Sequence, residues 1–271
     1  DANGNILTQI RHSETGAQIE DLTYQYAKDG NSKTVQNRLY HVNETVTAAA
    51  FADDIDDQGT FTDTLTQINY KNNYSYDAKG ELIKDSLYEH IKEIKWRVDG
   101  KISEVIRYPG SPKKNMKFDY DAMGMRVAKH IYDSNNNWEK STFYVRDAQG
   151  NVMGVYEKKI DNTTLLMSYK VKERHIYGSS RVGMNVNEQE FIGAPPIDTS
   201  LFIRTLGLKQ YEKTNHLGNV LAVVTDKKIP HDDNNDTFTD RYTAELLMSS
   251  DYYPFGMVMP ARNFTSEKYR Y

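Results

Sequence analysis

Histidine is the side chain most often used for acid–base chemistry near neutral pH, and this chain of 271 residues contains seven. None of them forms a His-x-x-x-His pair or a glutamate-containing metal motif. His216 falls in a predicted turn, but a general base also needs an oriented partner, and no local pattern supplies one. We therefore interpret all seven as turn or packing residues: His12, His41, His90, His130, His175, His216 and His231.

Other catalytic signatures are also missing from the sequence. It has neither a Gly-x-Ser-x-Gly elbow for a serine nucleophile nor a glycine-rich phosphate-binding loop. Cysteine is absent, which excludes disulfides, thiolate metal sites and a cysteine nucleophile. Acidic pairs are frequent, but a glycosidase needs two carboxylates at a fixed separation across a cleft, which sequence spacing cannot show. The sequence therefore predicts a non-enzymatic protein with no catalytic residue and no cofactor.

Two acidic stretches have the composition of calcium-binding loops. Residues 53–63 place oxygen-bearing side chains at alternate positions before Gly59: Asp54, Asp56 and Gln58. An EF-hand loop needs glutamate at its twelfth position, where this chain has Leu65. Residues 232–240 end in the same Thr-Phe-Thr-Asp sequence but have no glycine at the turn. Because Asp- and Asn-rich turns also arise for conformational reasons alone, we interpret both stretches as solvated loop tips, with calcium binding as the alternative.

The elements that would position any site are recurring tight turns between strands. The clearest lies between Tyr120 and Val127 and contains Asp121 and Gly124. An aspartate side chain can accept a hydrogen bond from the backbone two residues later, and glycine supplies the positive φ of such turns. The flanking aromatic and β-branched residues suit a pleated, half-buried surface. This pattern predicts a β-hairpin.

The same turn recurs along the chain. The fullest copies share an aspartate and a glycine three residues later: Asp1–Gly4, Asp77–Gly80, Asp121–Gly124 and Asp147–Gly150. Asp29-Gly30 and Asp99-Gly100 are shorter versions, whereas the turns at Gly218 and Gly256 keep the glycine and lose the aspartate. From Gly80 through Gly100 and Gly124 to Gly150 the intervals are 20, 24 and 26 residues. This loose period of one hairpin plus its connection indicates a repeat architecture.

Composition agrees with wet β-sheets rather than a dense helical core. Hydrophobic residues make up 38% of the chain and the mean hydropathy is −0.75, yet tyrosine alone contributes 20 residues. The net charge is −4, and the longest basic runs are pairs such as Lys113-Lys114, so nucleic acid is not an expected partner. No window approaches the roughly 20 apolar residues of a membrane span.

Strands are predicted over most of the chain. We expect residues 6–10 to pair with 19–26, and the stretch 91–96 to be a strand rather than part of a helix. Because Val220–Val224 is continuously apolar, that strand should be covered on both faces. Three segments interrupt the strands, namely acidic inserts at 43–72 and 227–241 and a proline-rich loop at 193–200.

The Tyr-Asp-x-x-Gly turns resemble the YD repeats of RHS proteins. Three later runs resemble the sequence leading into the RHS-repeat-associated core region: His175–Arg181, Asn215–Val220 and Asp251–Met257. The resemblance covers essentially all of residues 1–271, as a single segment of a larger protein. It implies a continuous, curved spiral sheet forming part of a hollow shell, which in the family encloses a C-terminal polypeptide, often a toxin. Aspartates of the core region cleave that chain in the family, and none of them is matched here.

Two functions follow as expectations. The first is a structural shell segment of a secreted or bacterial cell-surface protein, which encloses or presents a C-terminal polypeptide. Its partners would be the rest of the same polypeptide and other secretion or surface proteins. The alternative is a surface carbohydrate-binding or adhesion module, in which exposed aromatic rings stack on sugars. Trp96 and Trp138 are the first residues to test for that role.

Overall fold

The structure is a computed structural model that describes residues 1–13, 15–29, 31, 33–46, 55, 73–86, 90–160, 166–192 and 204–266. Among the described residues, strands take up 61% and helix 1%, so the predicted all-β class is confirmed. The chain divides into two compact units, Asp1–Glu139 and Lys140–Tyr271. The proline-rich loop 193–200 and nearly all of the acidic stretch 53–63 lie outside the described residues.

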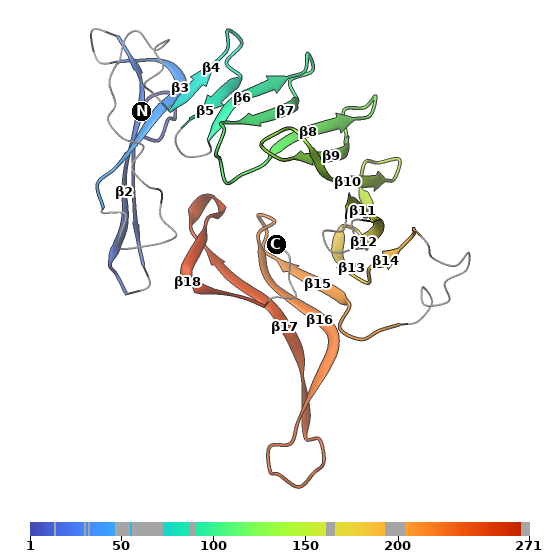
Figure 1. The fold of residues 1–271 in the computed structure, drawn as a ribbon. Coiled ribbons are helices and arrows are strands. Elements are labelled where there is room, and N and C mark those ends of the chain that lie inside the picture. The colour runs from blue at the N-terminus through green and yellow to red at the C-terminus, as the bar shows by residue number, and fades with distance from the viewer. Residues whose placement is uncertain are drawn as a thin grey trace. The chain divides into compact units, whose positions relative to one another are not determined.

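The first unit contains nine complete strands, which belong to two antiparallel sheets (Figure 1). The smaller sheet consists of β1 (Thr8–His12), β2 (Gln18–Lys28) and β3 (Thr34–Glu44). The others are β4 (Tyr74–Tyr76), β5 (Leu82–Asp85), β6 (Ile91–Trp96), β7 (Ile102–Arg107), β8 (Asn115–Tyr120) and β9 (Arg126–Tyr132). The pairing of Thr8 with Thr23 and of Ile10 with Asp21 confirms the predicted first hairpin.

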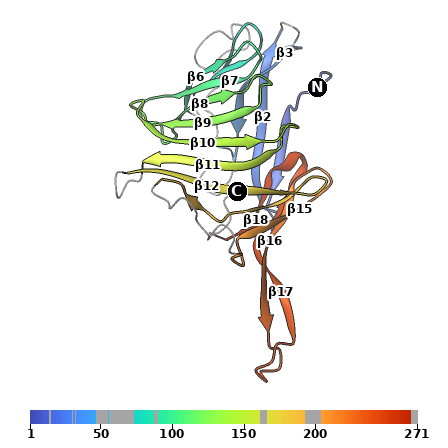
Figure 2. The same ribbon diagram turned by 90° about the vertical axis from the view of Figure 1, so that its right-hand side faces the viewer.

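The second unit contains the remaining strands, except that β10 begins two residues before it. They are β10 (Trp138–Arg146), β11 (Val152–Ile160), β12 (Met167–Tyr177), β13 (Arg181–Asn185), β14 (Gln189–Glu190), β15 (Lys209–Thr214), β16 (Val220–His231), β17 (Arg241–Tyr252) and β18 (Val258–Thr265). A short 3-10 helix, η2 (Pro254–Gly256), precedes β18. Figure 2 shows β10, β11 and β12 side by side.

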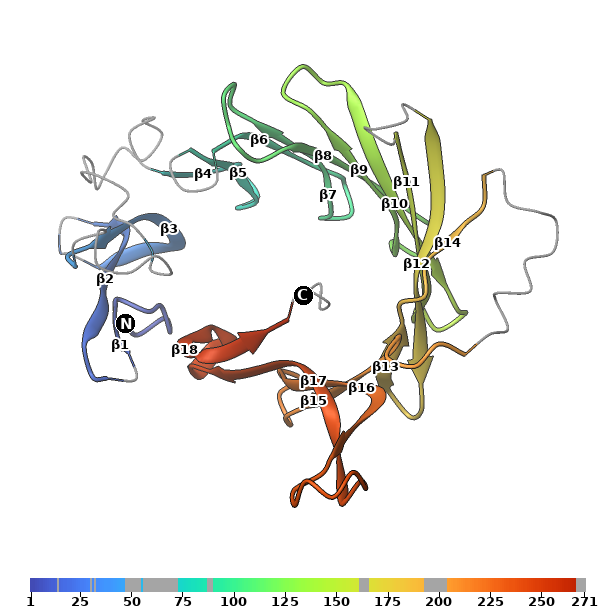
Figure 3. The same cartoon turned by 60° about the horizontal axis from the view of Figure 1, so that its bottom comes forward.

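Fifteen strands form one antiparallel sheet. Its order is β18-β17-β16-β15-β13-β12-β11-β10-β9-β8-β7-β6-β5-β4. β14 pairs with β12 beside this path (Figure 3). Most neighbours in the sheet are also neighbours in sequence, as expected for consecutive hairpins. The long antiparallel sheet predicted from the repeated turns is therefore confirmed.

Alternation of side chains gives the sheet two different faces. In the first unit, Ile94 and Val105 face each other across β6 and β7 and are buried. The next register row carries charge: Glu104 lies between Lys95 and Lys117, with N–O distances of 2.8 and 3.4 Å. Burial raises the pKa of the Glu104 carboxyl, but the hydrogen bonds from both lysines outweigh it and hold that pKa below its ordinary value.

Two predictions about the second unit are wrong. The insert expected at 227–241 is shorter, because β16 runs to His231 and β17 starts at Arg241. Backbone pairing such as Lys228 with Ala244 extends the ribbon without needing apolar side chains. The Val220–Val224 run is not covered throughout, because Val223 is fully buried while Leu221 is 40% exposed. An antiparallel sheet, unlike a parallel one, can leave such a residue facing solvent.

The first insert is also shorter at its start, since β3 continues to Glu44. The stretch 91–96 forms β6, so the strand prediction there is confirmed.

Candidate functional site

Each aspartate turn is held by its own carboxylate. Asp121 Oδ1 accepts hydrogen bonds from the amides of Met123 and Met125, at 2.9 and 2.8 Å. The Gly124 amide donates to the Asp121 carbonyl at 3.0 Å, and the φ of Gly124 is +76°. The predicted Asx turn and the predicted role of glycine are both confirmed here.

The same two bonds recur at the other turns. Side-chain oxygens that accept from the residues two and four positions later belong to Asp1, Asp29, Asp121, Asp133, Asp147 and Asn215. At Asn215 an amide oxygen replaces the carboxylate, so the turn geometry survives the loss of aspartate. Hydrogen bonds from the Asn137 and Asn151 side chains are the main causes that lower the pKa of Asp133 and Asp147, respectively.

An aromatic side chain at the end of the strand before a turn ties adjacent strands together. In four cases its polar atom donates to the carbonyl of the residue two positions after the glycine of another turn. The bonds are Trp96 Nε1 to Leu82 (2.8 Å), Tyr120 Oη to Ile102 (2.7 Å), Tyr177 Oη to Val152 (2.9 Å) and Tyr252 Oη to Val220 (2.7 Å). We call these four bonds the aromatic latches. Each one joins two neighbouring strands of the sheet next to their turns.

The ring of the Tyr120 latch is also packed against basic side chains. The Arg97 guanidinium lies 5.2 Å from the centre of the Tyr120 ring, and the Lys101 ammonium lies 6.0 Å from it. A Cβ atom at Gly124 would come within 2.8 Å of Lys101 Nζ, so glycine there serves both the turn and this packing.

Tyr76 makes a related bond to the Leu39 carbonyl at 2.8 Å. Burial, reinforced by the neighbouring Tyr74, raises the pKa of Tyr76 to about 12, so its hydroxyl keeps the proton that it donates. The sequence analysis missed these bonds, because they join residues that lie 14 or more positions apart. The signal that could have found them is the aromatic residue directly before a turn.

The two tryptophans proposed for sugar binding are both partly exposed. Trp96 is half-buried and its indole N–H forms a latch. Trp138 opens β10 and is also half-buried.

The histidines do not assemble into a catalytic group among the residues that the structure describes. His216 is exposed in its turn, and His130 Nε2 lies 2.9 Å from Asp119. His175 Nε2 lies 3.2 Å from the Glu173 carboxylate, and both side chains are buried. In the same described parts of the chain, no group of three or more His, Asp or Glu residues could hold a metal ion.

The acidic tip 232–240 uses its carboxylates on its own backbone. Asp232 accepts from the amides of Asp236 and Thr237, and Asp240 accepts from the amide of Asp233. Asp233 also pairs with Arg241 at 2.8 Å. These bonds support the interpretation of this stretch as a loop tip.

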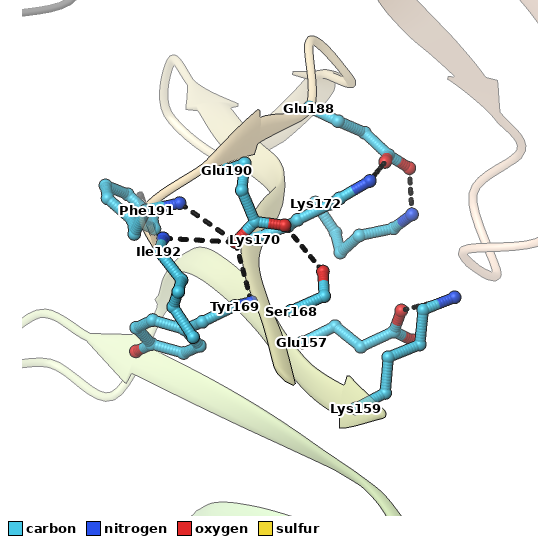
Figure 4. Close-up of polar contacts among 10 residues, drawn as sticks. All are labelled: Glu157, Lys159, Ser168, Tyr169, Lys170, Lys172, Glu188, Glu190, Phe191 and Ile192. Atoms are coloured by element: carbon cyan, nitrogen blue, oxygen red, sulfur yellow. Dashed lines mark hydrogen bonds and ion pairs between the residues drawn. The ribbon is translucent and has the colours of Figure 1, made fainter. Parts of the chain in front are cut away.

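Glu188 and Glu190 fix the segment around β14 to β12, and we call their contacts the clamp (Figure 4). Glu190 accepts hydrogen bonds from the Ser168 hydroxyl (2.6 Å) and the Tyr169 amide (2.7 Å), and from the amides that follow it. Burial raises the pKa of Glu190, but these bonds outweigh it and leave that pKa lowered. Glu188 adds ion pairs to Lys170 and Lys172.

The clamp places Phe191 among three other rings. Phe191 lies 6.0 Å from Tyr156 and 5.7 Å from Tyr169, centre to centre, and Phe143 meets Tyr169 edge-on at 6.3 Å. Tyr156 and Tyr169 stack at 6.1 Å. We call these four rings the aromatic platform. In Figure 4, Tyr169 and Phe191 lie to one side of the clamp and the lysine–glutamate pairs to the other.

In the described parts of the chain, no helix is both long and apolar enough to cross a membrane. Comparison with known proteins found no matching family model and no matching curated protein. Among solved structures, the chain is similar to "Crystal Structure of TcdB2-TccC3 without hypervariable C-terminal region", with 11% identity and a TM-score of 0.41. The match covers 95% of this chain and 16% of that chain, so the present chain spans a small part of the structure it matches.

Proposed function

We propose that this chain is a non-enzymatic structural segment of an RHS/YD-repeat protein, whose sheet encloses or presents a C-terminal polypeptide. The observation that carries the proposal is the aromatic latch, which recurs in both units and joins four pairs of neighbouring strands near their turns. A hairpin alone is marginally stable, so bonds between hairpins are what a wall of repeats requires.

The side chains of the repeat support a structural role in a second way. The turn aspartates accept bonds from their own backbone, and the latch hydroxyls are occupied by carbonyls. Because these side chains already form hydrogen bonds to the backbone, they are poorly suited to bind a substrate. The family resemblance of the turns and of the runs at His175, Asn215 and Asp251 supports the same proposal.

Protease protection of the parent polypeptide tests this function. We expect the segment downstream of this chain to resist digestion in the native protein. A variant that breaks two latches, Tyr120→Phe with Tyr177→Phe, should make that segment more accessible. A Tyr132→Phe variant is the matched control, because the Tyr132 hydroxyl forms no hydrogen bond with any described residue. Enclosure would be excluded if the downstream segment were digested at the same rate in the native protein and in both variants, and as fast as the same segment in a free peptide.

Secretion or display on a bacterial cell surface is part of the same proposal. The chain contains no cysteine, so it has no thiol that an oxidising extracellular environment could oxidise. Fractionation of cells that make the parent protein, with detection by an antibody to this segment, measures the location.

A further inference from the structure

The tyrosines of this chain fall into groups with different surroundings. The hydroxyls of the latch tyrosines donate hydrogen bonds to backbone carbonyls. The hydroxyls of Tyr156 and Tyr169 have no hydrogen-bond partner among the described residues, and both side chains are half-buried. Their rings nevertheless pack with Phe143 and with Phe191, which is 44% exposed. The aromatic platform therefore combines an accessible apolar ring with two hydroxyls that have no hydrogen-bond partner in the described part of the chain.

We propose that the aromatic platform binds neutral carbohydrate. A pyranose ring has an apolar face of C–H groups and a rim of hydroxyls. The apolar face would stack on the ring of Phe191, and sugar hydroxyls would bond to the phenols of Tyr156 and Tyr169. This site lies wholly within the second unit. Carbohydrate binding is a role beyond the structural one, so its test does not depend on whether the sheet encloses a polypeptide.

The free hydroxyls favour a sugar over an apolar polypeptide. A hydrophobic segment covering the platform would bury both phenols without partners, and each buried unsatisfied hydroxyl is costly. A polyhydroxylated ligand supplies those partners. Tyrosine is also suited to such binding because its ring is rigid and loses little conformational entropy.

Charge complementarity points to a neutral ligand. All four platform side chains are uncharged. Lys158, which is in register with Tyr169, already has an interaction within the chain. Arg174, also in β12, donates to the Asn187 carbonyl and to Gln189 Oε1. Binding of single-stranded nucleic acid combines stacking with a positively charged groove, and the platform offers only the stacking.

The platform is held in place before any ligand arrives. The Glu190 carboxylate binds the amides of Phe191 and Tyr169, which fixes the backbone on both sides of the ring contact. Gly154 leaves room for Tyr156, since a Cβ atom there would come within 3.3 Å of Tyr156 Cε2. Rings fixed in this way lose little freedom on binding, which favours affinity.

Binding of the 271-residue chain to a printed array of neutral oligosaccharides tests the proposal, and each hit is remeasured by titration calorimetry with that oligosaccharide. Phe191→Ala should weaken binding about tenfold, the loss of one good stacking contact. The Tyr156→Phe and Tyr169→Phe changes keep both rings and should each weaken it about fivefold, the usual worth of one hydrogen bond. Tyr132→Phe should leave the affinity unchanged.

Circular dichroism of each variant confirms that it is folded, and the two Tyr→Phe variants keep the test decisive if Phe191→Ala does not fold. The proposal is overturned if no neutral oligosaccharide binds the folded chain at millimolar concentration. It is also overturned if binding survives both hydroxyl deletions unchanged. Tighter binding of the apolar dye anilinonaphthalene sulfonate to the Tyr→Phe variants, without oligosaccharide binding, would identify an apolar docking surface instead.

Discussion

At the scale of single residues, aspartate stabilises hairpin turns and tyrosine joins one hairpin to its neighbour. The aspartate of a turn accepts from two backbone amides, and the aromatic residue before the turn bonds to the preceding strand of the sheet. The type of residue at each position follows from the bond that it makes. Aspartate needs an accessible oxygen close to its own backbone, and tyrosine needs a long ring with a donor at its end.

Loss of one latch hydroxyl should measurably destabilise the chain. Tyr120→Phe leaves the Ile102 carbonyl without the 2.7 Å bond, and we expect the free energy of unfolding to fall by about 1 kcal/mol. Urea denaturation measures this change. Tyr132→Phe, which removes a hydroxyl with no hydrogen-bond partner among the described residues, should change the free energy of unfolding by less than about 0.5 kcal/mol. Equal effects of the two substitutions would show that the latch bond contributes nothing.

The turn aspartates predict a loss of stability in acid. Hydrogen bonds lower the pKa of Asp77, Asp133 and Asp147 in the folded chain below the ordinary value of 3.8. Their contribution is therefore fully present above that value and is lost as pH falls through the folded pKa values. Urea midpoints measured from about pH 6 to pH 2.5 should drop in this window. In the triple Asp→Asn variant the drop should be smaller, because asparagine keeps an acceptor oxygen without titrating.

Tyr76 predicts a loss at the alkaline end. Its pKa is raised to about 12 when folded, whereas an unfolded tyrosine titrates near 10. Stability from this group is complete below about pH 10 and declines as pH rises toward 12, because only the unfolded state releases the proton. Tyr76→Phe should reduce the slope of stability against pH in that window. An unchanged slope would contradict the burial of this hydroxyl.

At the scale of elements, the sequence predicted hairpins well and their connections poorly. A turn such as Asp121–Gly124 is encoded by adjacent residues, so its hydrogen bonds could be foreseen. The latch from Tyr252 to Val220 joins residues 32 positions apart, and it depends on a strand register that no local pattern gives. For the same reason the reach of β16 to His231 and the platform around Phe191 were not foreseen.

A close approach of strands predicts an asymmetry between two glycines. A Cβ atom at Gly183 in β13 would lie 2.1 Å from the Gln210 carbonyl oxygen of β15, so Gly183→Ala must push the two strands apart. We expect it to cost about 3 kcal/mol. Gly178→Ala, whose new methyl would meet Val182 at an ordinary 3.7 Å, should cost less than about 0.5 kcal/mol. Thermal unfolding of both variants measures the difference, and similar melting temperatures would contradict this packing.

At the scale of the whole molecule, both units use the same module of turn, strand and latch. Stability that depends on neighbouring hairpins is typical of repeat proteins, in which each repeat contacts mainly the next. This is the property that the proposed structural segment requires.

Electron cryo-microscopy of the complete parent protein tests the central claim most directly. The account predicts that β4 to β18 will be part of one continuous sheet, with latch contacts at the turn ends and polypeptide density on the enclosed side. Strands that close into separate barrels, or a sheet that surrounds no polypeptide, would contradict it.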